Sequence, residues 1–226
     1  RPPYVRGTAE LMAPYVKDEQ IIVNVAKGIE EKTLMTMTDI ISEEIPAAGV
    51  YVLSGPSHAE EVGRGIPTTC VISGPKRETA EYLQGIFMSP VFRVYTTPDT
   101  LGVELGGSLK NVIALAAGTA DGLGYGDNTK AALITRGIAE IARLGTKMGA
   151  HMETFYGLSG MGDLIVTCAS VHSRNRKAGY LMGKGYTMQQ AMNEVKMVVE
   201  GVYSAKAAKS LAEKYDVEMP IIMEVN

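Results

Sequence analysis

The first hundred residues alternate between short apolar runs and amphipathic stretches. The apolar runs lie at 21–25, 50–53 and 68–72, and helical periodicity covers 31–44, 58–63 and 77–88. Each apolar run is rich in β-branched residues and is followed by a glycine-containing turn, which is typical of strands buried on both faces of a parallel sheet. The alternation predicts a doubly wound, Rossmann-type α/β sheet.

After residue 98 the β-branched runs disappear and helical periodicity continues to the end. The predicted helices span about 99–119, 128–149, 159–169, 174–183, 187–194 and 200–214. They are separated by Gly-rich or Asn/Asp-containing breaks. We therefore predict a domain boundary near residue 98, with an α/β domain over 1–98 and an all-helical domain over 99–226.

Composition narrows the classes of partner. The chain has 226 residues, 46% hydrophobic content and a formal charge of -3, so it falls in the ordinary globular class. The acidic balance gives no reason to expect nucleic acid as a partner, and no apolar run is long enough for membrane insertion. Cys70 and Cys168 have neither metal nor disulfide-framework spacing, so a reducing cytoplasm fits best.

Two turns follow predicted strands directly and are candidate site segments. Lys27-Gly28 comes after the first run and Gly55-Pro56-Ser57 after the second. Open α/β sheets bind ligands beyond the carboxyl ends of their strands. Both turns are therefore expected to line a binding site.

The helix around Lys110 has one apolar face and one face of small residues. Its apolar face follows helical spacing from Leu105 to Ala116, and Lys110 points away from it. No acid on the same helix lies within reach of the lysine. Something packed closely on the small residues, a backbone or a cofactor, would explain the pattern, whereas the alternative is an ordinary surface lysine.

A second constellation combines a carboxylate and a hydroxyl. Asp163 follows Gly160-Met161-Gly162, and Thr167 lies one helical turn later on the same face. Such a pair can bind substrate hydroxyl groups together. Asp163 could equally be a helix N-cap.

The third constellation is the densest basic stretch of the chain, residues 172–177. Ser173 is a natural N-cap for a helix that begins at Arg174, so free backbone N–H groups, a guanidinium and the amide of Asn175 would converge. A phosphate needs such donors. A solvated charged turn is the alternative.

Two further patterns are set aside. The run from Gly122 to Gly126 looks like a dinucleotide fingerprint, but it follows a predicted helix and its third glycine comes one residue early. We interpret it as a loop that ends at an Asn128 cap. The histidines His58, His151 and His172 have no spacing that suggests a metal site, so no metal is expected.

Seven motifs occur in order along the chain. They are Lys27-Gly28-Ile29-Glu30, the stretch 53–59, the stretch 104–112, the stretch 122–128, the stretch 157–164, Ser173-Arg174-Asn175 and Val199-Glu200-Gly201. Together they resemble the NAD(P)-dependent glycerol-3-phosphate dehydrogenase family in its bacterial form. The resemblance implies a dihydroxyacetone phosphate reductase that uses NADPH or NADH and makes sn-glycerol 3-phosphate for phospholipid synthesis. The resemblance also implies a homodimer, and it makes 1–98 a partial nucleotide-binding domain and 99–226 the substrate and catalytic domain.

The resemblance also implies roles for individual residues. Lys110 matches the catalytic lysine, which donates a proton to the developing C2 alkoxide. The matched substrate-contacting positions are Lys27, Gly55, Ser57, Lys110, Asp163, Thr167, Ser173, Arg174 and Asn175. The matched cofactor-contacting positions are Lys27, Ala59, Arg174, Val198 and Glu200.

One large departure from the family concerns the ends of the chain. The family's glycine-rich loop, and the residue that selects NADH or NADPH, would precede Arg1, and the family continues with a further helix beyond Ile222. We therefore expect a truncated chain that turns over little by itself. The rival interpretations are a two-domain β-hydroxyacid dehydrogenase with a similar lysine–asparagine arrangement, or a non-catalytic remnant.

Overall fold

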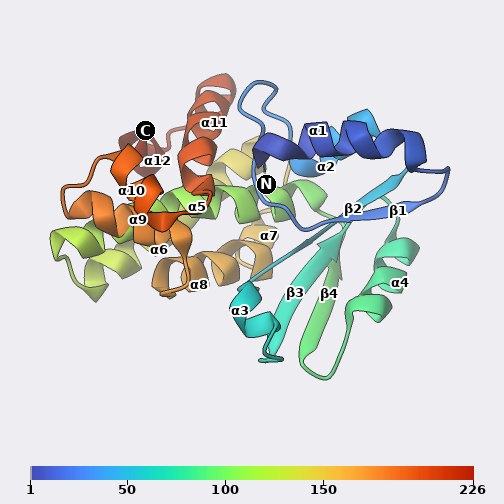
Figure 1. Cartoon of the computed structure of the whole chain (residues 1–226), viewed down its shortest axis with the longest axis horizontal. Helices are drawn as coiled ribbons and strands as arrows, with labels where there is room; N and C mark the ends of the chain where they lie inside the picture. Colours follow the sequence, from blue (N-terminus) through green and yellow to red (C-terminus); the bar gives the residue numbers. More distant parts are fainter. Residues whose placement is uncertain (1) are drawn as a thin grey trace.

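A computed structural model of the chain describes residues 2–226; Arg1, the first residue of the predicted N-terminal domain, lies outside them. A four-stranded sheet with its helices lies beside a larger body of helices (Figure 1). The longest helix, α5 (Thr100–Leu123), runs through the middle of the molecule and contacts both parts. The prediction of an α/β part followed by helices is therefore confirmed.

The sheet has the strand order β1-β2-β3-β4, with β1 (Ile21–Asn24), β2 (Gly49–Ser54), β3 (Thr68–Ser73) and β4 (Phe92–Thr97). β1 pairs with β2 and β3 with β4 in parallel, but β2 and β3 are antiparallel, with Leu53 opposite Ile72. The sheet is thus mixed and not wholly parallel as predicted. A parallel crossover needs a long connection, and the segment after β2 holds only the short helix α3 (Ala59–Val62), which turns the chain back.

β1 is less buried than its sequence suggested. Within the described residues it pairs only with β2, and its first residue, Ile21, is 40% exposed. The expectation that this strand is buried on both faces is wrong, because a β-branched run has the same sequence at the edge of a sheet as at its centre. β4 was not predicted from the sequence.

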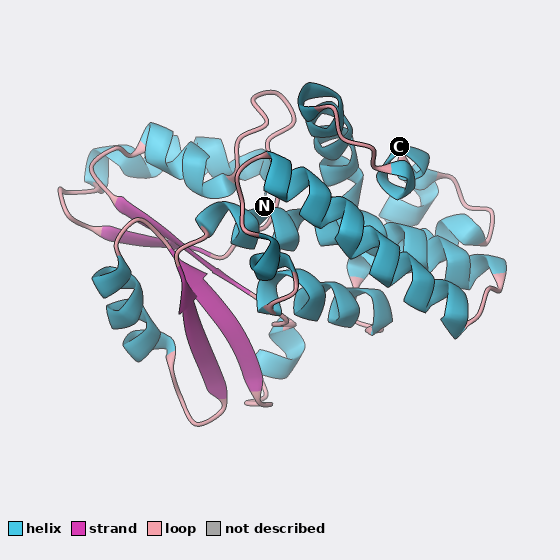
Figure 2. Ribbon diagram, turned by 180° about the vertical axis from the view of Figure 1, so that it is seen from behind, coloured by secondary structure: helices cyan, strands magenta, loops and turns pink. Residues whose placement is uncertain are grey.

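The two faces of the sheet are covered by different helices, as the alternation of side chains along β2 requires. Val50 packs with α1 (Pro2–Met12) and α2 (Met37–Glu44), and the short 3-10 helix Ala13–Tyr15 extends α1. Tyr51 points to the opposite face, where α4 (Arg77–Phe87) covers β3 and β4 (Figure 2). α1 was not predicted either.

The remaining helices surround α5. They are α6 (Asp127–Lys147), α7 (Met152–Phe155), the π-helical turn η2 (Leu158–Gly162), α8 (Asp163–Ala169), α9 (Arg174–Gly183), α10 (Met188–Val195), α11 (Glu200–Tyr215) and α12 (Pro220–Val225). α9 lies against α5 at backbone distance: a Cβ on Gly179 would stand 2.1 Å from the Leu115 carbonyl oxygen. Only glycine allows this approach, which carries α9 to the middle of α5.

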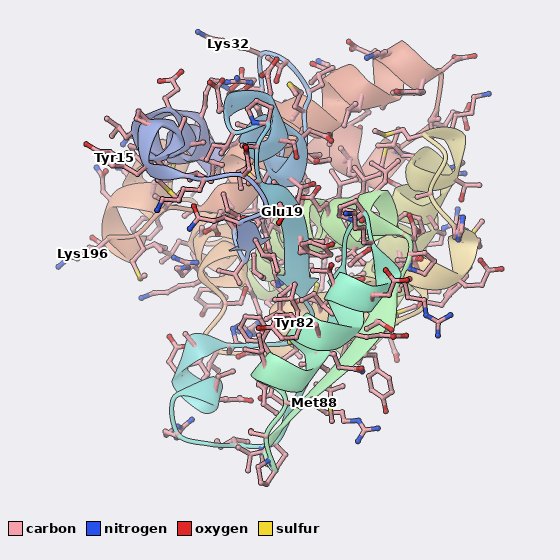
Figure 3. All side chains as sticks on the ribbon, turned by 90° about the vertical axis from the view of Figure 1, so that its right-hand side faces the viewer. Tyr15, Glu19, Lys32, Tyr82, Met88 and Lys196 are labelled. Carbon is pink, nitrogen blue, oxygen red and sulfur yellow. The ribbon has the colours of Figure 1, made fainter. Side chains whose placement is uncertain are left out.

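The stretch 122–126 is only partly a loop. Gly122 and Leu123 belong to the end of α5, so the predicted loop covers only 124–126; α6 then begins with Gly126 as its N-cap, and the predicted Asn128 cap is wrong. Lys196 ends α10 with a left-handed backbone (φ 55°) and lies on the surface (Figure 3).

In the described part of the chain, no helix is long and apolar enough to cross a membrane.

Candidate active site

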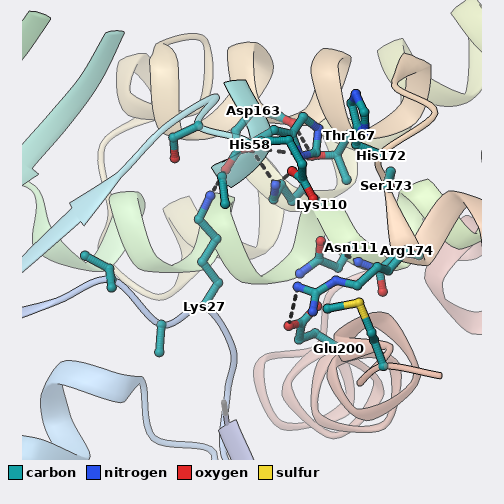
Figure 4. Close-up of a pocket in the computed structure, with 17 residues that line it drawn as sticks. Lys27, His58, Lys110, Asn111, Asp163, Thr167, His172, Ser173, Arg174 and Glu200 are labelled. Carbon is teal, nitrogen blue, oxygen red and sulfur yellow. Dashed lines mark hydrogen bonds and ion pairs between the residues drawn. The ribbon is translucent and has the colours of Figure 1, made fainter. Parts of the chain in front are cut away.

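A cavity of about 630 Å³ lies between the turns that follow β1 and β2 and the helices α5, α8, α9 and α11 (Figure 4). The sheet side contributes Val25, Ala26, Lys27, Ser57, His58, Ala59 and Glu60. The helical side contributes Lys110, Asn111, Asp163, Thr167, His172, Ser173, Arg174, Asn175, Met197 and Glu200. The two predicted strand-end turns and all three predicted constellations therefore meet at one cavity.

Lys110 is buried in the middle of α5, and its side chain has a polar partner from another helix. Its Nζ donates to Asp163 Oδ1 at 2.5 Å and to Thr167 Oγ1 at 2.6 Å. Only 6% of the residue is exposed, so the interpretation as a surface lysine is wrong. The small residues beside it do accommodate backbone: a Cβ on Gly106 would stand 2.8 Å from the Ser159 carbonyl oxygen.

Asp163 lies between two ammonium groups. Its Oδ1 accepts from Lys110, and its Oδ2 forms an ion pair with Lys27, whose Nζ also donates to the Gly55 carbonyl oxygen at 3.2 Å. Asp163 opens α8 without capping it, since the preceding Gly162 is already helical and the carboxylate faces the lysines. The N-cap interpretation is therefore wrong, and the substrate-binding role of Asp163 stays a prediction.

The pKa values of Lys110 and Asp163 are both lowered, but for different reasons. Burial, followed by the nearby Lys27 ammonium, lowers the pKa of Lys110 to about 8, although Asp163 opposes the shift. Burial would raise the pKa of Asp163, but the ammonium groups of Lys27 and Lys110 outweigh it and lower that pKa. At neutral pH the carboxylate is charged and the buried lysine is close to its titration range.

Thr167 connects the same cluster to the backbone of α8. Its hydroxyl accepts from Lys110 and donates to the main-chain oxygen of Asp163 at 2.6 Å. This contact requires the two residues to lie one turn apart on one helix face, as the sequence predicted.

The turn that carries Lys27 is fixed onto α5. The Gly28 N–H donates to Ser108 Oγ at 2.8 Å, and Asn24 at the end of β1 holds Ala26 through two hydrogen bonds of 2.9 Å. Gly28 has a φ of 148°, which favours glycine. These contacts place the Lys27 side chain over the same helix as Lys110.

Gly55 stands behind the cavity rather than on its wall. Its φ is 149°, and a Cβ there would lie 3.0 Å from the Cα of Cys70. Its carbonyl oxygen holds Lys27. Ser57, two residues later, does line the cavity.

The basic turn before α9 forms the other end of the cavity. Ser173 caps α9 by accepting from the Arg176 N–H at 3.2 Å, as predicted. Arg174 is only partly buried, and its Nη2 lies 3.1 Å from Glu200 Oε1. The turn is therefore not simply a solvated charge run.

Asn175 is buried and already engaged by the protein. Its Nδ2 donates to Asn111 Oδ1 at 3.0 Å, and its Oδ1 accepts from the Gly201 N–H at 2.8 Å. The side chain thereby joins α9 to α5 and α11. Asn175 also lines the cavity, so the phosphate contact that the resemblance implied stays a prediction beside this structural role.

The residues matched to cofactor contacts are not all on the cavity wall. Ala59 and Glu200 line it, whereas Val198 does not, and its neighbour Met197 takes that place. Sequence reasoning also left out His58, Asn111 and His172, all of which line the cavity. Their positions beside or within the quoted motifs are the only sequence signal that could have found them.

Across residues 2–226, no group of three or more His, Cys, Asp or Glu side chains is placed to hold a metal ion. Both cysteines, Cys70 and Cys168, are buried free thiols.

Comparison with known proteins identifies the family. Residues 3–80 match the family model described as NAD-dependent glycerol-3-phosphate dehydrogenase N-terminus, and residues 99–226 match the corresponding C-terminus model. A glycerol-3-phosphate dehydrogenase (NAD(P)+) of Agathobacter rectalis is 70% identical over 99% of this chain and 66% of its own length. One of Fusobacterium nucleatum is 66% identical over 98% of this chain and 67% of its length.

Solved structures agree with the sequence relatives. The crystal structure of glycerol-3-phosphate dehydrogenase from Coxiella burnetii has a TM-score of 0.94 and 35% identity, covering 98% of this chain and 68% of that one. The chain spans about two thirds of the length of the curated relatives it matches. With two family models, close relatives and a shared fold in agreement, the chain belongs to the NAD-dependent glycerol-3-phosphate dehydrogenase family.

Proposed function

We propose that the protein carrying this chain reduces dihydroxyacetone phosphate to sn-glycerol 3-phosphate with NADPH or NADH. One observation carries the proposal: the buried Lys110–Asp163 pair and the Arg174 turn at the start of α9 line the same cavity. A three-carbon phosphate ester has a reacting carbonyl at one end and an anion at the other. The cavity offers a proton donor and an anion-binding helix end to match.

The cavity also fits the cofactor that the family requires. Its volume of about 630 Å³ lies in the range that holds a drug-sized ligand, more than a triose phosphate needs. Val25, Ala26 and Ala59 give part of its wall an apolar, small-residue surface on which a flat ring can pack. Lys27, Ala59, Arg174, Val198 and Glu200 would hold the nucleotide, which supplies the hydride when bound.

The residues of the chain supply the proton and the charge stabilisation. When C2 accepts a hydride, negative charge develops on its oxygen, and the Lys110 ammonium donates a proton to that oxygen. A pKa of about 8 lets the same group donate in reduction and accept in oxidation. Asp163 and Thr167 hold the Nζ at a fixed place and orient the substrate hydroxyl groups.

We assign binding of the phosphate to the end of the cavity formed by the turn before α9. The Ser173 hydroxyl and the N–H groups at the start of α9 donate hydrogen bonds to the phosphate oxygens, and Arg174 supplies positive charge. Lys27, Gly55 and Ser57 complete the substrate contacts at the sheet edge, Gly55 through Lys27. Asn175 acts by holding α9 in place.

The wider setting of the reaction follows from the same proposal. The product would feed glycerophospholipid synthesis in the cytoplasm, where reduced thiols such as Cys70 and Cys168 persist. The substrate domain would begin after residue 98, and the enzyme would be a homodimer.

The test measures oxidation of NADPH by dihydroxyacetone phosphate, with the 226-residue chain and with a version extended to the length of the relatives. Lys110→Met should reduce kcat by about 10³-fold in the active form, because a general acid contributes roughly 10² to 10⁴. Lys206→Met, at an exposed lysine of α11, is the matched control and should leave kcat unchanged. Unchanged activity in Lys110→Met, or preference for 3-hydroxy acids over dihydroxyacetone phosphate, would refute the proposal.

A further inference from the structure

Glu104 is a buried carboxyl group that takes no direct part in the proposed reaction. It lies on α5, on the N-terminal side of Lys110, and it does not line the cavity. Only 6% of the residue is exposed, and none of the salt bridges among the described residues involves it. Burial raises the pKa of Glu104, and hydrogen bonds from Thr36 and Thr38 oppose this rise. A buried carboxyl group without a cation is stable only when it forms such hydrogen bonds.

The hydrogen bonds of Glu104 come from the beginning of α2 and from the end of β1. Its Oε1 accepts the Thr38 N–H at 3.0 Å, and its Oε2 accepts the Thr38 hydroxyl. Thr38 lies in the first turn of α2, where N–H groups have no partner within the helix and a carboxyl oxygen is favoured. The Asn24 Nδ2 lies 3.5 Å from the same Oε1. Glu104 therefore joins α5 to α2 and to the last residue of β1.

Asn24 connects this contact to the turn that carries Lys27. Its Nδ2 donates to the Ala26 carbonyl oxygen and its Oδ1 accepts the Ala26 N–H, both at 2.9 Å. Glu104 Oε1 is an acceptor whether or not the carboxyl group is protonated, so it fixes which end of the Asn24 amide carries the donors. The path of the chain from β1 into Lys27 therefore depends on Glu104.

The same face of α5 holds the rest of this turn. Ser108 lies one helical turn after Glu104 and accepts the Gly28 N–H at 2.8 Å. The stem of Lys27 passes Gly107, where a Cβ would stand 3.5 Å from Lys27 Cδ. From this support the Lys27 ammonium reaches its carboxylate partner on α8 (Figure 4).

We propose that Glu104 is a positioning residue, which through Asn24 fixes the turn that places the Lys27 ammonium in the site. This inference rests on the proposed function, because Lys27 shares Asp163 with the proton donor Lys110. Loss of Glu104 leaves the Asn24 amide free to turn, and the Lys27 ammonium then moves away from Asp163.

The pKa of Lys110 reports where the Lys27 ammonium lies. Burial, and next the Lys27 ammonium, lower this pKa to about 8. NMR titration of the chain with isotope-labelled lysine side chains measures it, with the Lys110 signal assigned from Lys110→Met. Glu104→Met has a similar volume and no acceptor oxygen, so it should raise the pKa toward 10.5, by an amount comparable with Lys27→Met. Glu104→Gln retains the oxygen that Thr38 and Asn24 share and should keep most of the wild-type value.

A double variant separates positioning from a general loosening of the core. If Glu104 acts through Lys27, Glu104→Met should cause no further change in the pKa of Lys110 once Lys27 is replaced by methionine. A change of the same size with and without Lys27 overturns the proposal. An unchanged pKa in Glu104→Met overturns it as well.

Glu140→Met is the matched control. Glu140 is also a buried carboxyl group at the beginning of a helix, where it accepts the N–H groups of Ile221 and Ile222 at 3.0 and 3.3 Å. It does not line the cavity. Its replacement should leave the pKa of Lys110 unchanged.

Asn24→Ala removes the link to the turn and leaves the contacts of Glu104 with α2 intact, so it carries the test if Glu104→Met does not fold. It should raise the pKa of Lys110 in the same way. An unchanged value in this variant would contradict the proposal. Circular dichroism of each variant verifies that the fold is retained.

The failures of the two proposals can be distinguished, because the titration needs neither substrate nor turnover. If the extended protein does not reduce dihydroxyacetone phosphate but the pKa of Lys110 moves as described, only the proposed function fails. If the extended protein is active and this pKa does not move in Glu104→Met, only the role of Glu104 fails.

Discussion

The two ends of the cavity hold their charges in different ways. At one end Lys110 and Asp163 are almost fully buried, with side-chain exposures of 7% and 2%. At the other end Arg174 keeps 35% of its side chain exposed and faces Glu200 at 3.1 Å. Buried ion pairs depend on both partners, whereas partly exposed pairs are worth little and are readily exchanged. This difference agrees with the roles proposed for the two ends, proton transfer at Lys110 and capture of an anion at Arg174.

The largest expected effect comes from breaking the buried end. Asp163→Asn leaves the Lys27 and Lys110 ammonium groups close together without their carboxylate, and loss of one partner from a buried pair costs about 3–5 kcal/mol. Urea unfolding should show this loss, and adding Lys110→Met should restore part of it. Asp18→Asn, at an exposed loop residue, should have no such effect. A stability equal to wild type would mean that the buried pair is not held as described.

Removing the cation from the exposed end should affect binding more than stability. Arg174→Gln should weaken binding of glycerol phosphate by about 10- to 100-fold, since hydrogen bonds to charged groups contribute roughly 1.5–3 kcal/mol. Calorimetry at two salt concentrations measures the effect, and the dependence on salt should decrease with the lost charge. Arg136→Gln, on the exposed face of α6, serves as control. Unaltered affinity would remove Arg174 from the phosphate site.

The pH dependence of turnover sharpens the description of the buried end. Reduction needs protonated Lys110, so kcat should fall as pH rises through about 8, and kcat for oxidation should rise over the same range. Because the Lys27 ammonium lowers this pKa, Lys27→Met should move both limbs to higher pH, toward the ordinary value of 10.5. Lys32→Met, at an exposed loop lysine, should leave them in place. A profile that does not move in Lys27→Met would contradict the assignment.

The smallest effect is expected from the carboxylate that competes for Arg174. Glu200→Gln removes the pairing charge, and an exposed pair is worth about 0–1 kcal/mol, so phosphate should bind up to about 5-fold more tightly. Titration with inorganic phosphate measures this change. Weaker binding would show that Glu200 orients the arginine rather than competing with the ligand.

Local sequence patterns predicted most elements of the fold. The helix α9 and its Ser173 cap were expected at the residues where they occur, since an N-cap depends only on neighbouring residues. The antiparallel pairing of β2 with β3 could not be predicted in this way. Strand direction depends on where the chain returns, and the short segment around α3 gives no periodic signal.

The candidate site shows the same division. The shared helix face of Asp163 and Thr167 follows from their spacing. The two lysines that contact Asp163 are remote in sequence: Lys27 precedes it by 136 positions and Lys110 by 53. The contacts of Asn175 with Asn111 and Gly201 could not be predicted either, because they join remote segments of the chain. No spacing in the sequence marked His58 as a site residue, and only the structure places it on the cavity wall.

The sequence by itself determined most of the helices and strands, the Ser173 cap of α9 and which side chains share a helix face, because backbone sterics and side-chain periodicity act over a few residues. It also carried the family resemblance. Only the tertiary structure decided that Lys110 is buried, that Asp163 is shared by two lysines and that Arg174 remains partly exposed. Burial and charge proximity are properties of distances between remote segments, and these distances set the pKa of the lysine on which the proposed chemistry depends.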